Sequence, residues 1–514
     1  MKKLLLGLSL IATLFISCAD DAAAPKDAGL QAIPSTTSTV TAINIKQLFE
    51  KADFDAVKKM AFYKEMIAEV EKDGETAIAN VLRDPASSGI NLDANAYVMS
   101  DIDAKNPERI FTAIVMNLKD VDAFEKLATA NAGSVEQQSG YKTVANASNP
   151  TVAWNDDIVV IGAMNNGRGD NAKHLDAIFN GTEEGSIAGN KDLQKALAGG
   201  HDISSWFNTN QIATNPQAGL AMSMLQIPAD ALKDNSIHGT YDFENGAIVG
   251  NSEFFMNKEL GKNFIGRFFK DDVSTNFGDY LPAENLVFAT SMALDFKGID
   301  QFLSERPQAK GFVDYTLKEY GLTMKDVIET FGGDVLVAGL GGENIGSSNM
   351  FIATDVKDDA KLETFIDLAI ENNMLQELDE DVYKIMTVGL GGFTISQGRG
   401  YGQMVLKDGM LFISADESLL EKLQGGKLSK ADRADGKIID VLDENVLGAY
   451  FDFEAVRDMS TELKNVQFDH IEFEVDGKGA KFKMDLENDN VNSLKAIFEM
   501  INDSYLDSQK REAM

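Results

Sequence analysis

The feature that most constrains the fold is an order of sequence elements that occurs twice along the chain. The stretch "MNLKDVDAFEKL" at Met116–Leu127 has a counterpart in "TDVKDDAKLETF" at Thr354–Phe365. Both predict the end of an apolar strand, an Asx-x-Lys-Asp junction and an amphipathic helix. In the same way, "VAWNDDIVVIGA" from Val152 corresponds to "MVLKDGMLFISA" from Met404, and each predicts two strands joined by a turn. An order repeated over this many elements predicts two halves built to one plan.

Hairpins with Asn-Gly or Asp-Gly turns lie near the end of each half. They are "IHGTYDFENGAIVGNSEFF" from Ile237 and "DHIEFEVDGKGAKFKMDLE" from Asp469, ahead of the helical patterns "KELGKNFIGRFF" and "NSLKAIFEMI". Because tight hairpins join antiparallel strands, we expect an α+β fold with largely antiparallel sheets and packed helices. The expected organisation is a first α+β repeat at 39–272, a second at 281–505 and a polar tail at 506–514.

Asn or Asp recurs where predicted strands end. The positions are Asn44, Asn117, Asn208, Asp295, Asp355 and Asp452. One interpretation is a piece of chemistry used repeatedly. The other is scaffold, because short Asx side chains accept hydrogen bonds from free backbone N–H groups at turns and helix starts. Repetition at so many junctions favours scaffold.

The N-terminus indicates export. Lys2 and Lys3 precede the apolar run "LLLGLSLIATLFI", which is typical of a signal peptide, expected here over residues 1–17, and is too short to span a membrane. Ser17 and Cys18, the only cysteine in the chain, follow directly and resemble the lipobox of bacterial lipoproteins, although Phe15 replaces the usual Leu. The resemblance implies a lipid on Cys18 that anchors the protein to a membrane. An ordinary secretory signal that happens to end in cysteine is the alternative.

Residues 18–38 are small, polar and acidic, as expected of a flexible tether. Asp20 and Asp21 resemble the signal with which Bacteroidetes send lipoproteins to the cell surface, but any polar tether also needs some charge. No later segment approaches 18 continuous apolar residues. We therefore expect an outer-membrane lipoprotein of the cell envelope, with the periplasmic and the surface-exposed face both left open.

The charge balance excludes one class of partner. The chain has 47 basic and 81 acidic residues, a net charge of −34. Such a surface repels phosphate backbones, so we expect no nucleic-acid binding. Because 44% of the residues are hydrophobic, the chain is predicted to be globular rather than an acidic disordered polymer.

No catalytic motif is assembled in the sequence. The glycine cluster "DVLVAGLGGENIGSSN" is followed by another apolar strand pattern rather than a helix, so it predicts a turn and no dinucleotide site. The chain has four histidines, His174, His201, His238 and His470, none within four residues of another. His238 and His470 begin alternating strands whose carboxylates, Glu472 and Glu474 among them, are interpreted as a solvated face with ion pairs to Lys481 and Lys483. We predict no cofactor, no metal ligand and no identifiable catalytic residue.

Two further motifs have ordinary explanations. "GRGD" at Gly167–Asp170 contains an adhesion tripeptide, which chance also produces in chains of this length. Trp154 and Trp206 are the only tryptophans, and core packing is a simpler role for them than a sugar-binding platform.

The lipobox, the acidic tether and the phrases "AINIKQLFEK" and "DPASSGINLDANAYVMSD" resemble an uncharacterised lipoprotein family of Bacteroidetes, known as a domain of unknown function. The resemblance implies an envelope protein and supplies no catalytic residue. The favoured hypothesis is a non-enzymatic protein that binds an envelope protein or peptide. The alternative is a hydrolase of the envelope that depends on carboxylates meeting only in the fold.

Overall fold

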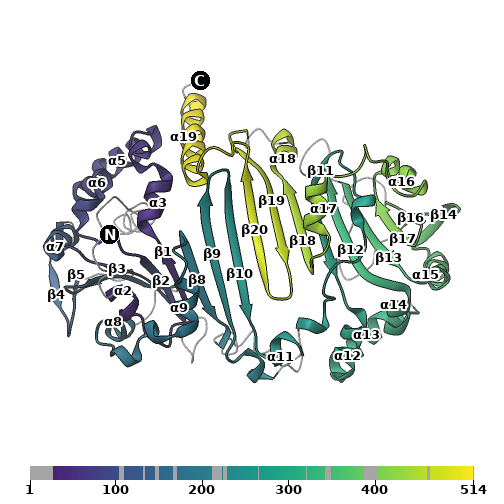
Figure 1. Cartoon of the computed structure of the whole chain (residues 1–514), viewed down its shortest axis with the longest axis horizontal. Coiled ribbons are helices and arrows are strands. Elements are labelled where there is room, and N and C mark those ends of the chain that lie inside the picture. Colours follow the sequence, from purple (N-terminus) through teal and green to yellow (C-terminus); the bar gives the residue numbers. More distant parts are fainter. Residues whose placement is uncertain are drawn as a thin grey trace. The chain divides into compact units, whose positions relative to one another are not determined.

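The structure is a computed structural model, shown in Figure 1. It describes residues 27–102, 109–130, 134–144, 150–165, 171–210, 223, 228–263, 265–319, 321–341, 349–386, 402–459 and 464–512. No helix within these ranges has the length and apolar composition needed to cross a membrane. The predicted signal peptide, Cys18 and the "GRGD" motif lie outside them.

The chain divides into two compact units. The first contains the described residues before Leu220, Leu232–Phe255 and the segment from Asn488 onward. The second contains the described residues of Ala221–Ala231 and Met256–Glu487. The chain therefore leaves the first unit, builds the second and returns to the first with its last helix, α19 (Ser493–Glu512). This helix packs against α3 (Ile45–Ala52) and α5 (Ala61–Lys72).

The described strands of the first unit pair antiparallel throughout. Their order is β10 (Ala247–Phe255), β9 (Ser236–Glu244), β8 (Ile203–Asn208), β1 (Thr39–Ile43), β2 (Ala96–Ile102), β3 (Ile110–Asn117), β7 (Ile158–Met164), β6 (Thr151–Trp154), β5 (Lys142–Val144) and β4 (Val135–Gln137). Helices lie between several strands that are not joined by hairpins, as between β1 and β2 and between β7 and β8.

The described strands of the second unit pair in the same order. They are β20 (Gly479–Leu486), β19 (Phe468–Val475), β18 (Leu447–Asp452), β11 (Leu286–Ala293), β12 (Phe331–Leu340), β13 (Asn349–Val356), β17 (Met410–Ser414), β16 (Gln403–Lys407), β15 (Val382–Ile385) and β14 (Leu375–Asp379). The α+β prediction is confirmed. The four predicted hairpins are β6–β7, β16–β17, β9–β10 and β19–β20, and each is an antiparallel pair.

Turn chemistry fits these hairpins. Asp408 and Gly409 link β16 to β17 with φ values of 52° and 72°, the left-handed pair that a tight two-residue turn requires.

One local prediction is wrong. The pattern from Lys258 predicts a continuous helix, but the structure has only the short α11 (Lys258–Gly261) and a 3-10 turn at Ile265–Arg267. Two glycines, Gly261 and Gly266, lie in this stretch and lower its helix propensity.

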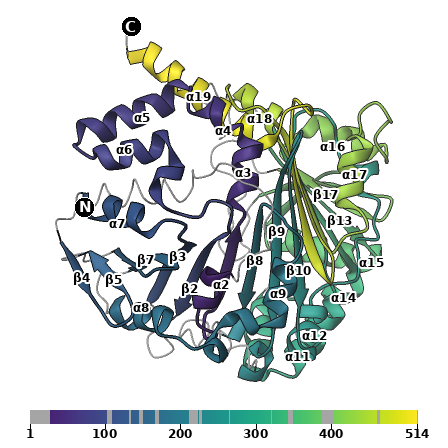
Figure 2. The same ribbon diagram turned by 60° about the vertical axis from the view of Figure 1, so that its left-hand side comes forward.

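Helices cover both faces of the first sheet (Figure 2). On one face lie α3 (Ile45–Ala52), α4 (Phe54–Val57), α5 (Ala61–Lys72), α6 (Thr76–Arg83) and α7 (Val121–Ala130); on the other lie α2 (Ala28–Ala32), α8 (Asn171–Phe179) and α9 (Lys191–Leu197). Strand β3 shows the alternation, because Met116 packs with the first group and Val115 with the second. Trp154 and Trp206 are buried on opposite faces, which confirms their role in the core.

The second sheet also has an apolar core on each face. Helices α16 (Glu417–Gln424) and α17 (Gly436–Leu442) supply Leu420, Leu423 and Leu442 to one core, whereas α15 (Asp359–Glu371) supplies Leu362 and Ile366 to the other. The remaining named helices are α12 (Phe296–Ser304), α13 (Pro307–Glu319), α14 (Met324–Thr330) and α18 (Phe453–Met459).

The Asx positions at strand ends are scaffold. All six side chains accept a hydrogen bond from a backbone N–H, the donors being Gln47, Gly29, Asn210, Gly298, Asp334 and Ala455 in chain order. Asn44 and Asp295 cap the helices that follow them. Asn117 and Asp355 instead accept from backbone N–H groups that are distant in sequence. In each of these two Asx-x-Lys-Asp motifs it is the final Asp, Asp120 or Asp358, that caps the next helix.

A buried carboxylate, Asp334 on β12, fixes the segment that leads into the second sheet. Its Oδ2 accepts from the backbone N–H and the hydroxyl of both Ser274 and Thr275, at 2.8–3.0 Å, and its Oδ1 pairs with the Lys270 ammonium. Burial alone would raise its pKa, but the hydrogen bonds from Lys270, Thr275 and Ser274 outweigh burial and hold the pKa below its usual range.

Asp443, directly after α17, lies in the opposite situation. Its Oδ1 is buried and has no hydrogen-bonding partner among the described residues. Burial, together with the like charges of Glu444 and Asp440, raises the pKa of Asp443 to about 6. The carboxyl is therefore protonated in mildly acidic solution, and near neutral pH it ionises in a half-buried position beside other carboxylates.

Asp443→Asn should stabilise the protein near neutral pH. Between the unfolded pKa of about 3.9 and the folded pKa of about 6, the unfolded state loses its proton first, so stability falls as pH rises. Above that pH window, ionised Asp443 lowers the free energy of unfolding of the wild type by a constant amount, on the order of 2 kcal/mol for a partly exposed group. The uncharged amide of the variant does not have this cost. Chemical denaturation at pH 7 and pH 4 measures the difference. An equal effect of the substitution at both pH values would contradict the assignment.

Candidate functional site

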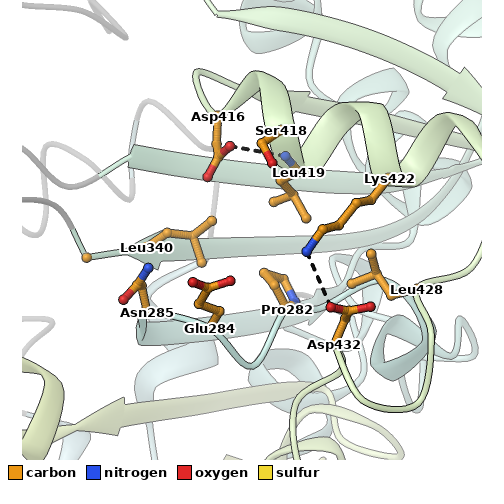
Figure 3. Close-up of a pocket in the computed structure, with 11 residues that line it drawn as sticks. Pro282, Glu284, Asn285, Leu340, Asp416, Ser418, Leu419, Lys422, Leu428 and Asp432 are labelled. Atoms are coloured by element: carbon orange, nitrogen blue, oxygen red, sulfur yellow. Dashed lines mark hydrogen bonds and ion pairs between the residues drawn. The ribbon is translucent and has the colours of Figure 1, made fainter.

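A pocket of about 180 Å³ opens in the second unit, beside the start of helix α16 (Figure 3). It is bounded by the segment before β11, the end of β12, the first turns of α16 and the loop after that helix. Its lining residues are Pro282, Glu284, Asn285, Leu340, Gly341, Asp416, Ser418, Leu419, Lys422, Leu428 and Asp432. The pocket combines a buried apolar wall with charged groups around the opening.

The apolar wall comes from the core. Pro282, Leu340, Leu419 and Leu428 are buried, and all but Pro282 belong to the core or pack directly into it. Helix α16 turns its leucines inward because they recur at helical spacing along one face. The same helix thus anchors the wall and projects its polar residues toward the opening.

The polar side of the pocket is rich in carboxylates. Asp416 caps α16 by accepting from the Leu419 N–H at 3.1 Å, and Glu284 is exposed at the rim. Across the pocket, Lys422 reaches from α16 to Asp432 at 3.3 Å (Figure 3). With three carboxylates and one ammonium, the lining carries a negative charge and favours a cationic ligand.

Asp432 is held in the ionised form. The hydroxyl of Ser429 donates to it at 2.5 Å, and with the Lys422 ammonium this lowers its pKa. An acid in that state cannot donate a proton to a leaving group. Asp432 therefore suits electrostatic recognition better than general-acid catalysis.

The loop that carries Leu428 and Asp432 is tied to the core through Asp279. The Asp279 carboxylate, nine-tenths buried, pairs with Arg433 and with Lys427, the latter at 2.6 Å. Its backbone C=O accepts from the Leu428 N–H at 2.9 Å. Both ends of the loop are thus bound to one residue, which sets the width of the pocket.

Sequence reasoning did not identify this pocket. Glu284 is more than a hundred residues of chain from Asp416 and Asp432, and the three belong to no motif. The one local signal is Asp416 before "ESLLEKLQ", a typical helix cap, which predicts a helix start and no binding site. Of the predicted glycine cluster, Gly339 lies within β12 and Gly341 at the pocket, whereas residues 342–348 lie outside the described ranges. The strand predicted after the cluster is β13, so a dinucleotide-type strand–turn–helix is not formed.

None of the four histidines lines the pocket. His174 stacks on Phe111 and lies 3.3 Å from Asp101, and His201 lies 2.6 Å from Asp242. His238 is buried against Phe255, and burial lowers its pKa. His470 is equally buried, but its hydrogen bond with Glu472 raises its pKa.

The ion pairs predicted on the second-unit hairpin are confirmed in part. Lys481 pairs with Glu474 at 3.6 Å, as predicted. Lys483 lies opposite Glu472 in the register but pairs with Asp485 at 2.8 Å instead. Glu472 lies 3.0 Å from the His470 Nε2.

Asp279→Asn should loosen the pocket loop. The amide cannot balance Arg433 and Lys427, so we expect a loss of about 2 kcal/mol in unfolding free energy and faster hydrogen exchange at residues 427–434. Hydrogen-exchange mass spectrometry on the variant measures this, with Glu421→Gln, an exposed change on α16, as control. Unchanged protection in that loop would show that Asp279 does not hold it.

Comparisons with known proteins place the chain in a family. Residues 31–425 match the family described as "Domain of unknown function (DUF4836)". No curated protein matches the chain. One similar solved structure, crystal form I of TP0453, is 9% identical, covers 46% of this chain and 80% of its own, and has a TM-score of 0.24. A match over most of the chain decides the assignment: this protein belongs to the DUF4836 family, a domain of unknown function.

Proposed function

We propose that this protein is a lipid-anchored protein of the bacterial cell envelope whose folded body binds an envelope protein or peptide through a basic side chain. The observation that carries the binding role is the acidic pocket beside α16. The lipid anchor rests on the N-terminal sequence, in which an export signal ends at Cys18. The outer membrane is the proposed location.

The size of the pocket limits what it can hold. At about 180 Å³ it is smaller than the roughly 300 Å³ at which pockets begin to enclose whole drug-sized ligands. A single side chain or a small headgroup fits this volume better than a complete cofactor. This supports recognition of part of a larger partner.

The chemistry of the lining selects among side chains. Lysine and arginine carry an apolar stem and a cationic end. The stem matches the wall formed by Leu340, Leu419 and Leu428, and the cation matches Glu284 and Asp416 at the opening. The net charge of −34 also attracts a basic partner from a distance.

The carboxylates around one pocket also favour a second candidate function, a carboxylate-dependent hydrolase. Glycosidases need one protonated acid beside one ionised carboxylate. Asp432 is held ionised by Ser429 and Lys422, and Asp416 is engaged as a helix cap. Because neither carboxylate is free to serve as the protonated acid, their interactions support binding over hydrolysis.

We infer as well that the two repeats predicted at 39–272 and 281–505 derive from one duplicated α+β unit. The identical order of strand pairing supports the inference, because independent sheets with this many strands have many other orders available. The Asx-x-Lys-Asp junctions support it too. In both junctions the Asx side chain accepts a hydrogen bond from a backbone N–H distant in sequence, and the final Asp side chain caps the next helix.

Cys18→Ala should release the protein from the membrane, because without an acylated cysteine the chain is held by no lipid. Fractionation of native cells followed by immunodetection measures this, with wild type expected in the outer-membrane fraction and the variant in the soluble one. Cross-linking the wild type in intact cells then identifies the partner. Membrane retention of the variant equal to wild type would refute the lipid anchor.

Glu284→Gln should weaken binding of a lysine-rich peptide by about threefold at low salt, since one exposed charge contributes on the order of 0.5–1 kcal/mol. Isothermal titration with oligolysine, and with a glutamine-rich peptide of equal length as a neutral probe, measures the effect. Glu421→Gln, on the same unit outside the pocket, should bind as wild type does.

Equal affinity for both peptides would refute recognition of a basic side chain by this pocket. Cleavage of chromogenic glycosides by the wild type, lost in Glu284→Gln, would favour the hydrolase.

A further inference from the structure

A histidine and two carboxylates converge on the hairpin β19–β20 in the second unit. His470 and Glu472 lie on the same face of β19, and Asp485 lies on β20 just beyond the Ile471–Met484 pair. The His470 Nε2 is 3.0 Å from Glu472 Oε1 and 3.1 Å from Asp485 Oδ2, and the three atoms all lie within 4.8 Å of one another. Each side chain is less than one-fifth exposed.

The imidazole is held in this orientation from its other side. Its Nδ1 lies 2.9 Å from Asp469 Oδ2, and the Tyr450 ring stacks on it with centroids 5.4 Å apart. Metal-binding histidines typically have a carboxylate at the second ring nitrogen, because this partner fixes the tautomer and directs the free nitrogen at the metal. Here the nitrogen directed at the proposed site is Nε2, which lies within hydrogen-bonding distance of Glu472 and Asp485.

We propose that His470, Glu472 and Asp485 bind a divalent transition-metal cation, with Zn²⁺ as the best match. Zn²⁺ accepts imidazole nitrogen and carboxylate oxygen at about 2.0–2.2 Å, so tetrahedral ligands are separated by roughly 3.3 Å. The distances from Nε2 to the two oxygens are already within a few tenths of an ångström of this value. Mg²⁺ and Ca²⁺ prefer more ligands and oxygen alone.

Three protein ligands leave the fourth position of a tetrahedral site open to water or to a ligand. Lys483 is the competing cation, since its ammonium lies 2.8 Å from Asp485 Oδ2. Its side chain is 46% exposed and can move into solvent when a metal takes that oxygen. A proton shared between His470 and the carboxylates is the other occupant that could balance them.

The corresponding hairpin of the first unit does not provide this set of ligands. His238 occupies the same place on β9, but Thr240 stands where β19 has Glu472. The residue opposite His238 is Glu253, which lies 3.3 Å from Lys195. The proposed site therefore distinguishes one unit from the other, although both have the same strand order.

Equilibrium dialysis of the purified mature protein against Zn²⁺, with metal analysis, tests the proposal. We expect a bound Zn²⁺ whose affinity falls at least tenfold in Glu472→Gln and in Asp485→Asn. Glu474→Gln is the matched control, because Glu474 shares the strand and the face but pairs with Lys481. Mg²⁺ at the same concentration should not compete.

Lys483→Gln should change affinity in the opposite direction, raising it severalfold, because the competing ammonium is gone; a purely structural ion cluster would give no such gain. If a carboxylate variant folds poorly, the rise in melting temperature on adding Zn²⁺ to wild type and to Lys483→Gln decides the question. No Zn²⁺ bound by wild type, or affinity equal in Glu472→Gln and Glu474→Gln, would overturn the proposal and leave a proton as the occupant.

Discussion

The antiparallel hydrogen-bond ladder at the centre of each unit is the constraint on which the rest of the structure depends. Strands β3 and β12 have a partner on each side and side chains packed into apolar cores. The chain's single cysteine is Cys18, so no disulfide can replace this ladder. Burial on both faces fixes the register, since a slip by one residue would exchange the two cores.

Buried carboxylates hold neighbouring loops in fixed positions. Asp334 holds Ser274 and Thr275, Asp279 holds the loop at 427–434, and Asp202 binds Lys51 and the Phe243 N–H. The carboxylates of Asp334 and Asp202 accept from backbone N–H groups that would otherwise lack partners, whereas that of Asp279 pairs with two side-chain cations. The pocket beside α16 has defined walls because one of these anchors sets the position of its loop.

Most of the architecture could be predicted from local patterns. The four hairpins, the Asx junctions and the two core tryptophans were expected from alternation, turn residues and spacing, all of which act over a few residues. The helix expected from Lys258 failed because its glycines weaken a pattern that looks amphipathic. The candidate sites were not predicted. Glu284 and Asp432 line one pocket although they are far apart in the chain, and Glu472 and Asp485 approach one imidazole through side-chain orientations that the turn residues of their hairpin do not determine.

The sequence alone determined the α+β class, the antiparallel hairpins and the strongly acidic surface, because periodicity, turn chemistry and charge are properties of neighbouring residues or of composition. Only the tertiary structure decided which carboxylates gather at a pocket and which turn toward His470. In the hairpin β19–β20 the register places Lys481 opposite its partner Glu474, but it also places Lys483 opposite Glu472. The side chains decided the rest, because Lys483 pairs with Asp485 on its own strand and Glu472 lies beside the imidazole of His470. Pairing between strands follows from the packing of the whole sheet, which is why the same residues read along the chain predicted only a solvated face.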